Sequence, residues 1–330
     1  MRAPNFWAAE SGGVAAAALT PLSWLYRLGA RSHAALARPS KAERPVICVG
    51  NFTVGGTGKT PTVLALAALL AEEGVRPHIL TRGYRGSERG PLRVDPAHHT
   101  ADAVGDEALL LARETPTWLC RDRPAGAAAA ASAGADVLLM DDGMQTPGLA
   151  KDFCFAVVDG GAGFGNGRLL PAGPLREPLA CGLGRAHALV LVGVDREGVL
   201  AALGPHDLPV IEASLMPGDE IRTLREQPIV AFAGIGRPEK FFETLAENGC
   251  NVIAQHAFAD HHRYKPGEIA AIVDQAKERD AVPVTTEKDH VRLPLDSRAA
   301  VRTLSVTLAW RDPAEPRSLL APLVTRCRRG

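Results

Sequence analysis

The sequence lacks an excess of charge of either sign. Lysine plus arginine and aspartate plus glutamate each number 37 in 330 residues, so the net charge is zero at neutral pH. A protein that binds nucleic acid usually carries a basic surface, and no global field of that kind exists here. We therefore expect no nucleic-acid partner.

Cysteine pairs and aromatic residues are also scarce. The six cysteines stand singly, with no C-x-x-C pair, which argues against the common zinc and disulfide patterns and favours a reducing compartment. Aromatic residues make up 5% of the chain, whereas apolar residues make up 46% and charged residues 22%. This balance excludes a disordered chain and is typical of an α/β enzyme with a core of small aliphatic side chains.

A long apolar run is missing as well. The uncharged stretch at residues 11–26 contains Pro21 and is shorter than the roughly 20 residues that a membrane-spanning helix needs. Glu10 stands just before it and no clear cleavage site follows, so a secretory signal fits poorly.

Residues 1–40 nevertheless combine apolar and basic side chains. The apolar group consists of Phe6, Trp7, Leu19, Leu22, Trp24, Leu25 and Tyr26, and Arg27, Arg31, Arg38, Lys41 and Arg44 follow it. This pattern indicates an amphipathic helix that lies in a membrane interface and meets anionic lipid through its arginines. The alternative is a first helix that packs on its own domain and exposes a basic face.

The rest of the chain alternates between strand and helix patterns. Short apolar runs occur at residues 46–49, 78–80, 137–140, 153–158, 188–192 and 229–233, with helical patterns such as 61–70 between them. The alternation predicts βαβ units and a mainly parallel sheet. The alanine-rich segment 125–135 reads as a helix that ends near Gly134. A new strand opens after about residue 220, in a section without a phosphate loop, so we predict a larger domain at 41–222 and a smaller α/β domain at 223–330.

The strongest motif is T-V-G-G-T-G-K-T at residues 53–60, between the strand at 46–49 and a helix that begins near Lys59. Its glycines let backbone N–H groups surround phosphate, Lys59 neutralises the β- and γ-oxygens, and the Thr60 hydroxyl faces Mg²⁺. Thr53 replaces the leading glycine of the usual pattern. The predicted nucleotide-binding residues are Thr53, Val54, Gly55, Gly56, Thr57, Gly58, Lys59 and Thr60.

A second acidic motif suits this phosphate loop. Asp141 and Asp142 directly follow the apolar strand at 137–140, where carboxylates would face the crevice at the carboxyl ends of parallel strands. An acid at a strand end is common by itself, but together with a phosphate loop it predicts a metal contact.

Three further clusters have structural explanations when each is taken alone. Gly105-Asp106-Glu107 could be the acidic first turn of a helix. Asp260-His261-His262 could combine an N-terminal helix cap with solvated histidines. The proline- and glycine-rich segment 170–177, which ends in Arg176-Glu177, could be an irregular surface loop.

Taken together, these clusters resemble the tetraacyldisaccharide 4′-kinase family, which phosphorylates a lipid A precursor in Gram-negative bacteria. The resemblance runs from Pro21 to about Leu293. It rests on G-N at 50–51, G-G-T-G-K-T-P at 55–61, T-R-G-Y at 81–84, G-D-E at 105–107, D-D-G-M-Q at 141–145, F-G-N-G at 164–167, L-P-A-G-P-L-R-E at 170–177, F-A-G-I-G at 232–236, D-H at 260–261 and T-E-K-D at 286–289. The family usually has leucine and histidine where Met144 and Thr146 stand, which leaves a contact at Thr146 in question.

The resemblance implies transfer of the γ-phosphate of ATP to the 4′-hydroxyl of a tetraacyldisaccharide 1-phosphate. It implies a P-loop domain with a smaller α/β domain that closes over the nucleotide. Thr60 and Glu107, helped by Asp141 and Asp142, would hold Mg²⁺. Asp106 would accept the hydroxyl proton with support from His261. Lys59 and Arg176 would stabilise charge on the phosphates. Glu177 would orient the residues around Arg176.

The same resemblance implies a function for the N-terminal helix. Because the acceptor lipid stays in the bilayer, the enzyme must work at the membrane surface, and we expect peripheral attachment to the cytoplasmic face of the bacterial inner membrane. We expect a monomer. The alternative function is a membrane-associated P-loop ATPase switch of the partitioning type, but that class has a second lysine early in its phosphate loop, where Asn51, Thr53 and Val54 are uncharged here.

Overall fold

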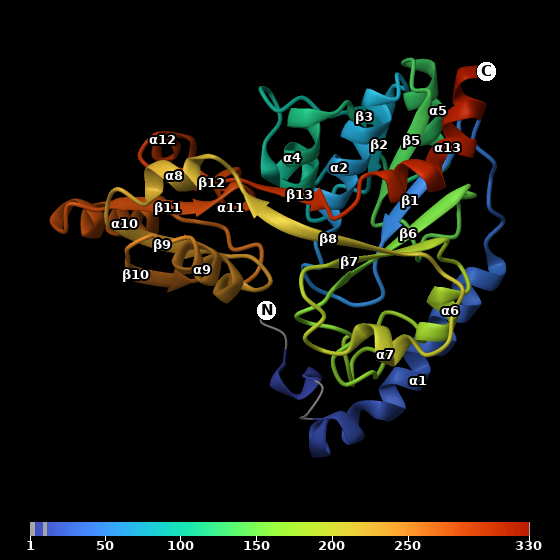
Figure 1. The fold of residues 1–330 in the computed structure, drawn as a ribbon, viewed down its shortest axis with the longest axis horizontal. Helices are drawn as coiled ribbons and strands as arrows, with labels where there is room; N and C mark the ends of the chain where they lie inside the picture. Colours follow the sequence, from blue (N-terminus) through green and yellow to red (C-terminus); the bar gives the residue numbers. More distant parts are fainter. Residues whose placement is uncertain (1–3, 9–11, 330) are drawn as a thin grey trace.

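The structure, a computed structural model, describes residues 4–8 and 12–329. The chain forms two α/β units, each built around its own sheet (Figure 1). The nine-stranded sheet has the order β13-β8-β7-β6-β1-β5-β2-β4-β3, and the four-stranded sheet has the order β10-β9-β11-β12.

The larger sheet contains β1 (Val46–Gly50), β2 (Pro77–Thr81), β3 (Leu92–Arg93), β4 (Thr117–Leu119), β5 (Val137–Asp141), β6 (Phe153–Asp159), β7 (Ala188–Val192), β8 (Val210–Pro217) and β13 (Val306–Trp310). All its pairings are parallel except β3 with β4 and β13 with β8. The smaller sheet contains β9 (Ile229–Ala233), β10 (Val252–Ala257), β11 (Val282–Thr286) and β12 (Arg302–Leu304), all parallel. The mainly parallel α/β fold expected from the sequence is confirmed.

The helices of the larger unit are α1 (Gly13–Leu36), α2 (Lys59–Glu72), α3 (Ala101–Val104), α4 (Asp106–Glu114), α5 (Arg123–Ser132), α6 (Leu179–Leu183), α7 (Val199–Leu203) and α13 (Ala314–Arg329), with a 3₁₀ turn η1 (Asn5–Trp7) before them. The smaller unit carries α8 (Glu220–Leu224), α9 (Pro238–Glu247), α10 (Pro266–Glu278), α11 (Glu287–His290) and α12 (Leu295–Arg298).

The central strands of the larger sheet are buried on both faces. In β1, Ile47 and Val49 enter the core under α2, whereas Val46 and Cys48 enter the core under α5. This alternation follows from the two-residue period of a strand, and burial on both faces explains why the strands read as continuous apolar runs. The alanine-rich segment forms α5, whose first turn is capped by Asp122, as its composition predicts.

The end of the chain returns to the larger unit, so the predicted domain boundary of 223–330 is wrong for its last part. β13 pairs antiparallel with β8, from Val306 opposite Pro217 to Trp310 opposite Ala213. Apolar side chains of α13, among them Leu320 and Val324, then join the core under α2. The smaller unit therefore ends near residue 305, and β8 and β13 are the two strands that connect it to the larger one (Figure 1).

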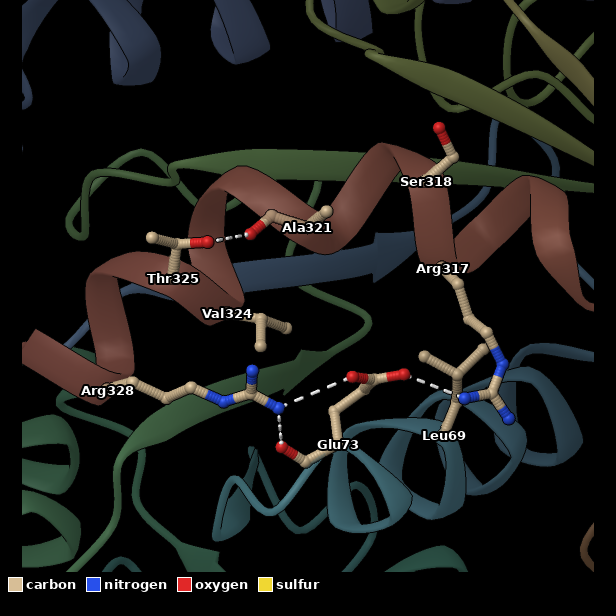
Figure 2. Close-up of a pocket in the computed structure, with 8 residues that line it drawn as sticks. All are labelled: Leu69, Glu73, Arg317, Ser318, Ala321, Val324, Thr325 and Arg328. Atoms are coloured by element: carbon tan, nitrogen blue, oxygen red, sulfur yellow. Dashed lines mark hydrogen bonds and ion pairs between the residues drawn. The ribbon is translucent and has the colours of Figure 1, made fainter.

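Polar contacts hold α13 against the end of α2. Figure 2 shows Glu73 between Arg317 and Arg328, in a pocket that Leu69, Ala321 and Val324 also line. Arg317 Nη1 lies 2.7 Å from Glu73 Oε1, and Arg328 Nη2 lies 3.4 Å from Oε2. Because the carboxylate already bridges two guanidinium groups, the pocket is a helix contact that closes the fold.

The N-terminal helix α1 is mostly exposed. Ala16 and Ser23 are the buried residues among its described side chains, while Trp24, Leu25 and Leu28 are 66%, 66% and 64% exposed. Ser23 Oγ donates to the carbonyl of Leu169 at 2.9 Å, which holds α1 to the 164–175 loop. Within the residues that the structure describes, no helix combines the length and apolarity needed to cross a membrane.

Phe6 and Trp7, which the sequence pattern places with the exposed apolar residues, are instead half-buried against the same loop. The Trp7 indole N–H donates to the Pro171 carbonyl at 3.1 Å, and Asn166 Nδ2 donates to the Phe6 carbonyl at 2.8 Å. These two residues anchor the start of the chain to the protein.

Candidate active site

The phosphate loop connects β1 to α2, as the motif predicts. Gly55 and Gly58 have φ angles of +119° and +90°, a region that L side chains rarely adopt, so glycine is needed at both positions. α2 begins at Lys59, and its amino end therefore faces the loop. Thr53, the residue that replaces the usual glycine, forms a bridge with Leu175, and the Val54 N–H donates to the Pro174 carbonyl at 2.9 Å.

Asn51 and Gln145 support this loop, although the sequence analysis gave neither residue a role. Asn51 is fully buried, and its side-chain amide donates to Thr57 Oγ1 at 3.1 Å. Gln145 Nε2 donates to the Asn51 carbonyl and to Glu177 Oε1, each at 2.9 Å. Glu177 also pairs with Arg185. This polar network connects the phosphate loop, through Asn51 and Gln145, to Glu177.

Three of the predicted site residues meet at the carboxyl end of β5. Asp142 Oδ1 lies 2.9 Å from Arg176 Nη1 and 3.7 Å from Lys59 Nζ. The burial of Asp142 raises its pKa, but the positive charges of Lys59 and Arg176 outweigh burial, so the pKa lies below its usual value. The structure thus gathers two cations beside the phosphate loop, where phosphate oxygens would lie.

Asp141 occupies the last position of β5 and is buried. Desolvation raises its pKa to about 7, with further repulsion from Glu107 and Asp142. Thr81 Oγ1 donates to Asp141 Oδ2 at 3.3 Å, and the buried Arg123, which sequence reasoning missed, donates to the Asp141 carbonyl at 3.3 Å. A cation near these three carboxylates would relieve their mutual repulsion.

Asp106 and His261 form a pair across the two units. Asp106 begins α4 of the larger unit, and its Oδ2 lies 2.8 Å from His261 Nδ1 of the smaller unit. The two side chains are 3% and 9% exposed. Burial opposes the charge of Asp106, but the His261 hydrogen bond and the positive charges of Lys288 and Arg292 lower its pKa to about 2. Asp106 is therefore ionised at neutral pH.

His262 faces a different partner. Its ring stacks on Phe258 with the centroids 4.7 Å apart, and its Nε2 lies 3.0 Å from Glu268 Oε2. The other interpretation of this motif, in which Asp260 caps the following helix, is wrong, because the residue directly before α10 is Lys265. The acidic first turn of α4 is real, and it coexists with the cross-unit contact of Asp106.

Two basic residues, Lys288 of the T-E-K-D motif and Arg292 just after it, contact the carboxylates of Glu107 and Asp106, and neither was predicted from the sequence. Lys288 Nζ lies 3.0 Å from Glu107 Oε1, and Arg292 Nε lies 3.4 Å from Asp106 Oδ2. The negative charge of Glu107 helps to raise the pKa of Lys288 although its burial opposes this. Lys288 lies within the motif at 286–289 that carries the resemblance, whereas Arg292 lies outside it, and the motif indicated no partner for either residue.

A second contact joins the units beside the phosphate loop. The buried Asp159, at the end of β6, lies 3.3 Å from Arg237 Nη1 and 3.1 Å from Lys240 Nζ. In the same turn of the smaller unit, a Cβ built on Gly236 would lie 3.4 Å from the Gly56 nitrogen. The smaller unit therefore rests directly on the loop that would hold phosphate.

The four predicted metal ligands do not form a finished metal site. Among residues 4–8 and 12–329, no group of three or more histidine, cysteine, aspartate or glutamate side chains lies close enough to hold a metal ion. Glu107 and Asp142 are instead neutralised by Lys288 and Arg176. Hard oxygen donors at this position fit Mg²⁺ that is shared with nucleotide phosphates, because Mg²⁺ commonly takes one or two protein carboxylates.

The environment of Asp141 predicts a gain in stability when its charge is removed. An unfolded aspartate loses its proton near pH 3.8, whereas the folded one keeps it to about pH 7, so folding stability falls as pH rises between these values. Asp141→Asn should therefore raise the free energy of unfolding of the nucleotide-free protein at pH 8 by about 4 kcal/mol, and by less than half of that at pH 5. Urea unfolding at both pH values measures this.

Asp136→Asn is the matched control for this substitution. Asp136 lies just before β5, and its hydrogen bond to Arg76 lowers its pKa. The control should lose stability at pH 8. Equal stability of Asp141→Asn and the natural protein at pH 8 would contradict a raised Asp141 pKa.

The comparisons with known proteins agree with this geometry. Residues 15–325 match the family described as LpxK, tetraacyldisaccharide-1-P 4′-kinase. A tetraacyldisaccharide 4′-kinase of Rhodospirillum centenum is 51% identical over 98% of this chain and 97% of its own length, and one of Paramagnetospirillum magneticum is 50% identical over 99% and 98%.

A solved structure is similar in fold. LpxK from Aquifex aeolicus, crystallised in complex with ATP, superposes with a TM-score of 0.73 and is 27% identical, covering 94% of this chain and 99% of that one. The resemblance seen in the sequence motifs is thus confirmed over nearly the whole length. This chain belongs to the tetraacyldisaccharide-1-P 4′-kinase family.

Proposed function

We propose that this protein transfers the γ-phosphate of ATP to the 4′-hydroxyl of a tetraacyldisaccharide 1-phosphate in lipid A biosynthesis. The observation that carries the proposal is the buried Asp106–His261 pair, which joins the two units of a member of this kinase family, next to Glu107, whose pKa is lowered by the charge of Lys288 and in part by that of Lys59. Phosphoryl transfer needs alignment and charge stabilisation more than covalent chemistry, and these residues would supply both.

The phosphate side of the reaction belongs to the larger unit. Backbone N–H groups of residues 55–60 and the amino end of α2 would hold the β- and γ-phosphates, with Lys59 Nζ neutralising them. In the present structure Arg176 pairs with Asp142. During the reaction its guanidinium group would also stabilise the negative charge that spreads over the oxygens of the γ-phosphoryl group.

The acceptor side belongs to Asp106 and His261. Because Asp106 is ionised, it can accept a hydrogen bond from the sugar hydroxyl and align its oxygen with the phosphorus atom. Proton loss from the hydroxyl comes late in a loose transition state, so a weak base suffices if it is well placed. His261, hydrogen-bonded to the same carboxylate, would share the proton that Asp106 receives.

Thr60, Glu107, Asp141 and Asp142 are the residues that would hold Mg²⁺ together with the phosphates. When bound, the ion would neutralise charge on the β- and γ-oxygens. Glu107 and Asp142 would then exchange their contacts with Lys288 and Arg176, since these carboxylates are paired with cations in the present structure.

The alternative, a partitioning-type ATPase switch, makes a different demand on the same cleft. Such a switch hydrolyses ATP without a lipid acceptor, so the Asp106–His261 pair would have no substrate. The deciding experiment incubates the protein with γ-³²P-ATP, Mg²⁺ and tetraacyldisaccharide 1-phosphate in detergent micelles. Label on the lipid, and ATP consumption that depends on the lipid, support the kinase. Consumption that ignores the lipid would support the switch.

We further propose that α1 attaches the protein peripherally to the cytoplasmic face of the inner membrane. Trp24, Leu25 and Leu28 form an exposed apolar patch one helical turn from Arg27 and Arg31, which are also exposed. Aromatic and aliphatic side chains would enter the headgroup boundary while the arginines meet lipid phosphates. This arrangement would bring the cleft to an acceptor that remains in the bilayer.

Replacing the three apolar residues of this patch by serine should weaken binding to phosphatidylglycerol vesicles by more than roughly tenfold, because each buried apolar side chain contributes about 1.5–3 kcal/mol. High salt should loosen the natural protein only partly, since apolar insertion is not screened. Vesicle flotation measures both effects. The control replaces Val194, Leu200 and Leu295, exposed apolar residues outside α1, by serine. Equal flotation of the α1 variant and the natural protein would place the membrane contact elsewhere.

A further inference from the structure

Arg292 is a buried arginine next to the Asp106–His261 contact between the two units. It follows α11 in the smaller unit, and its side chain is 6% exposed. Nη2 donates to the carbonyl of Gly234 at 3.0 Å and to Asp289 Oδ1 at 2.6 Å, while Nε donates to the carbonyl of Lys288 at 3.0 Å. Nη1 lies 3.4 Å from the carbonyl of His262. The guanidinium group thus ties α11 to the turns at 234 and 260–262.

Asp289 sets the position of this guanidinium group. Its side chain is fully buried and also accepts hydrogen bonds from the Gly234 N–H at 2.9 Å, the Tyr264 hydroxyl at 2.6 Å and the Thr286 hydroxyl at 2.6 Å. A buried carboxylate with four donors has little freedom, and the single charged hydrogen bond from Arg292 Nη2 to Oδ1, together with the bonds of Arg292 to backbone carbonyls, holds the guanidinium group in one orientation.

The His261 backbone needs such a support. Its φ angle is +55°, in the left-handed region that favours glycine, so this conformation must be held by its surroundings. The His261 N–H donates to the Gly234 carbonyl at 2.9 Å, the same oxygen that accepts from Arg292. Arg292 therefore donates to two carbonyls that fix the His261 turn. One is the Gly234 carbonyl, which also accepts the His261 N–H, and the other is the carbonyl of His262.

Arg292 also lies close to the Asp106 carboxylate of the larger unit. Asp106 Oδ2 lies 2.8 Å from His261 Nδ1 and 3.4 Å from Arg292 Nε. Oδ1 accepts only the Glu107 N–H at 2.9 Å among the described contacts. A carboxylate oxygen has two lone pairs, so Oδ1 keeps one for a substrate hydroxyl while Oδ2 is held by the smaller unit.

We propose that Arg292, held by Asp289, is a positioning residue for phosphoryl transfer: it fixes the His261 turn and the Asp106 carboxylate in one geometry across the cleft. The inference rests on the proposed function and adds a residue to it. Arg292 acts through His261 and Asp106 and has no contact of its own with the phosphate loop among the described residues.

Arg298 offers a matched control for a merely structural role. It lies in the same unit and donates from Nε to the Leu293 carbonyl at 3.1 Å and from Nη2 to the Val291 carbonyl at 2.7 Å. Within the described chain it makes no bond to Asp106 or to residues 260–262. Loss of Arg298 would weaken the same segment without releasing the His261 turn.

The experiment compares Arg292→Gln, Arg292→Lys and Arg298→Gln, each in the natural background and with His261→Ala. Arg292→Gln should lower kcat by roughly tenfold or more and change the KM for ATP less than about twofold, because ground-state nucleotide contacts remain. With His261→Ala present, the same substitution should cost less than about threefold, because the imidazole that the turn presents to Asp106 is gone and only the 3.4 Å ion pair of Arg292 with Asp106 remains to be lost. Arg298→Gln should change kcat less than about threefold in either background.

Hydrogen exchange of the backbone amides at 258–264 provides a readout that needs no substrate. Arg292→Gln should speed exchange of the His261 amide by roughly tenfold, and Arg298→Gln should leave it unchanged. Failure of the natural protein to transfer phosphate to the lipid would refute the proposed function. The exchange comparison would still test whether Arg292 holds the His261 turn.

Two results would overturn the role of Arg292. One is an equal loss of kcat in both backgrounds, which would mean that Arg292 acts independently of His261. The other is unchanged exchange at His261. If both Arg292 variants failed to fold, as judged by thermal unfolding, Arg292 would be a structural residue of the smaller unit and the proposal would be wrong.

Discussion

Asp106→Asn should lower kcat for phosphate transfer by roughly a thousandfold, within the range for loss of a positioned general base. Asparagine keeps the shape of the side chain but cannot accept the hydroxyl proton, and its amide would face His261 Nδ1, 2.8 Å from the present Oδ2. ATP affinity should change little, because the phosphate loop lies on other elements. Steady-state kinetics with both substrates and a separate measurement of ATP binding distinguish the two effects.

His261→Ala should lower kcat in the same direction, and the double variant should be less impaired than the product of the two single losses, since the residues act as a unit. Asp102→Asn is the control for the acid: Asp102 also pairs across the units, with Arg263 Nη2 at 3.0 Å, but both side chains are largely exposed. It should leave kcat within about twofold. Losses that simply multiply would show that Asp106 and His261 work separately.

Lys59→Ala is the second substitution for which we expect a loss of several orders of magnitude in kcat. Lys59 begins α2 beside the glycine turn, and its ammonium group lies 3.7 Å from Asp142. The positive charge of Lys59 would stabilise the β- and γ-oxygens most in the transition state, where negative charge shifts between them. Loss of this charge should therefore lower mainly kcat. Radiolabel transfer from ATP to the lipid measures it.

The Lys59→Ala variant should still fold, because Lys59 is the first residue of α2 and Asp142 would remain paired with Arg176. Circular dichroism and thermal unfolding check this. Lys277→Ala, which removes an exposed lysine paired with Asp274, should behave like the natural protein. A Lys59→Ala protein with near-normal turnover would refute the assignment of residues 53–60 to ATP.

Some parts of the site were open to prediction because their chemistry is local in sequence. The glycines at 55 and 58, Lys59 and Thr60 lie within one turn between a strand and a helix, so spacing alone indicates phosphate binding. Asp141 and Asp142 end a buried strand beside β1, with Asp141 opposite Val49, and parallel strands bring their carboxyl ends to one edge.

The Asp106–His261 pair could be expected only from the family resemblance. The two residues are 155 positions apart, and each has an ordinary explanation in its own segment. Their meeting depends on how the smaller unit sits on the larger one. Arg123, Lys288 and Arg292 had no local signal at all, since a buried arginine or lysine looks like any charged residue until its partner carboxylate is placed beside it.

The two ends of the chain show the same division between local pattern and tertiary contact. The apolar and basic pattern of residues 1–40 predicts an amphipathic helix, but not that Trp7 bonds to Pro171 and anchors the start of the chain. The pattern of strands and helices after residue 220 predicts a smaller α/β domain that runs to residue 330, but not that β13 leaves it and pairs with β8.

Sequence by itself determined the phosphate loop, the alternation of strands and helices, and the amphipathic start, because propensity, turn chemistry and periodicity act over a few residues. Tertiary structure decided which sheet β13 joins, which histidine faces Asp106, and which cations neutralise Glu107 and Asp142. Those outcomes depend on the burial of apolar surface and on the pairing of desolvated charges between distant segments, and both act only after the chain has brought them together.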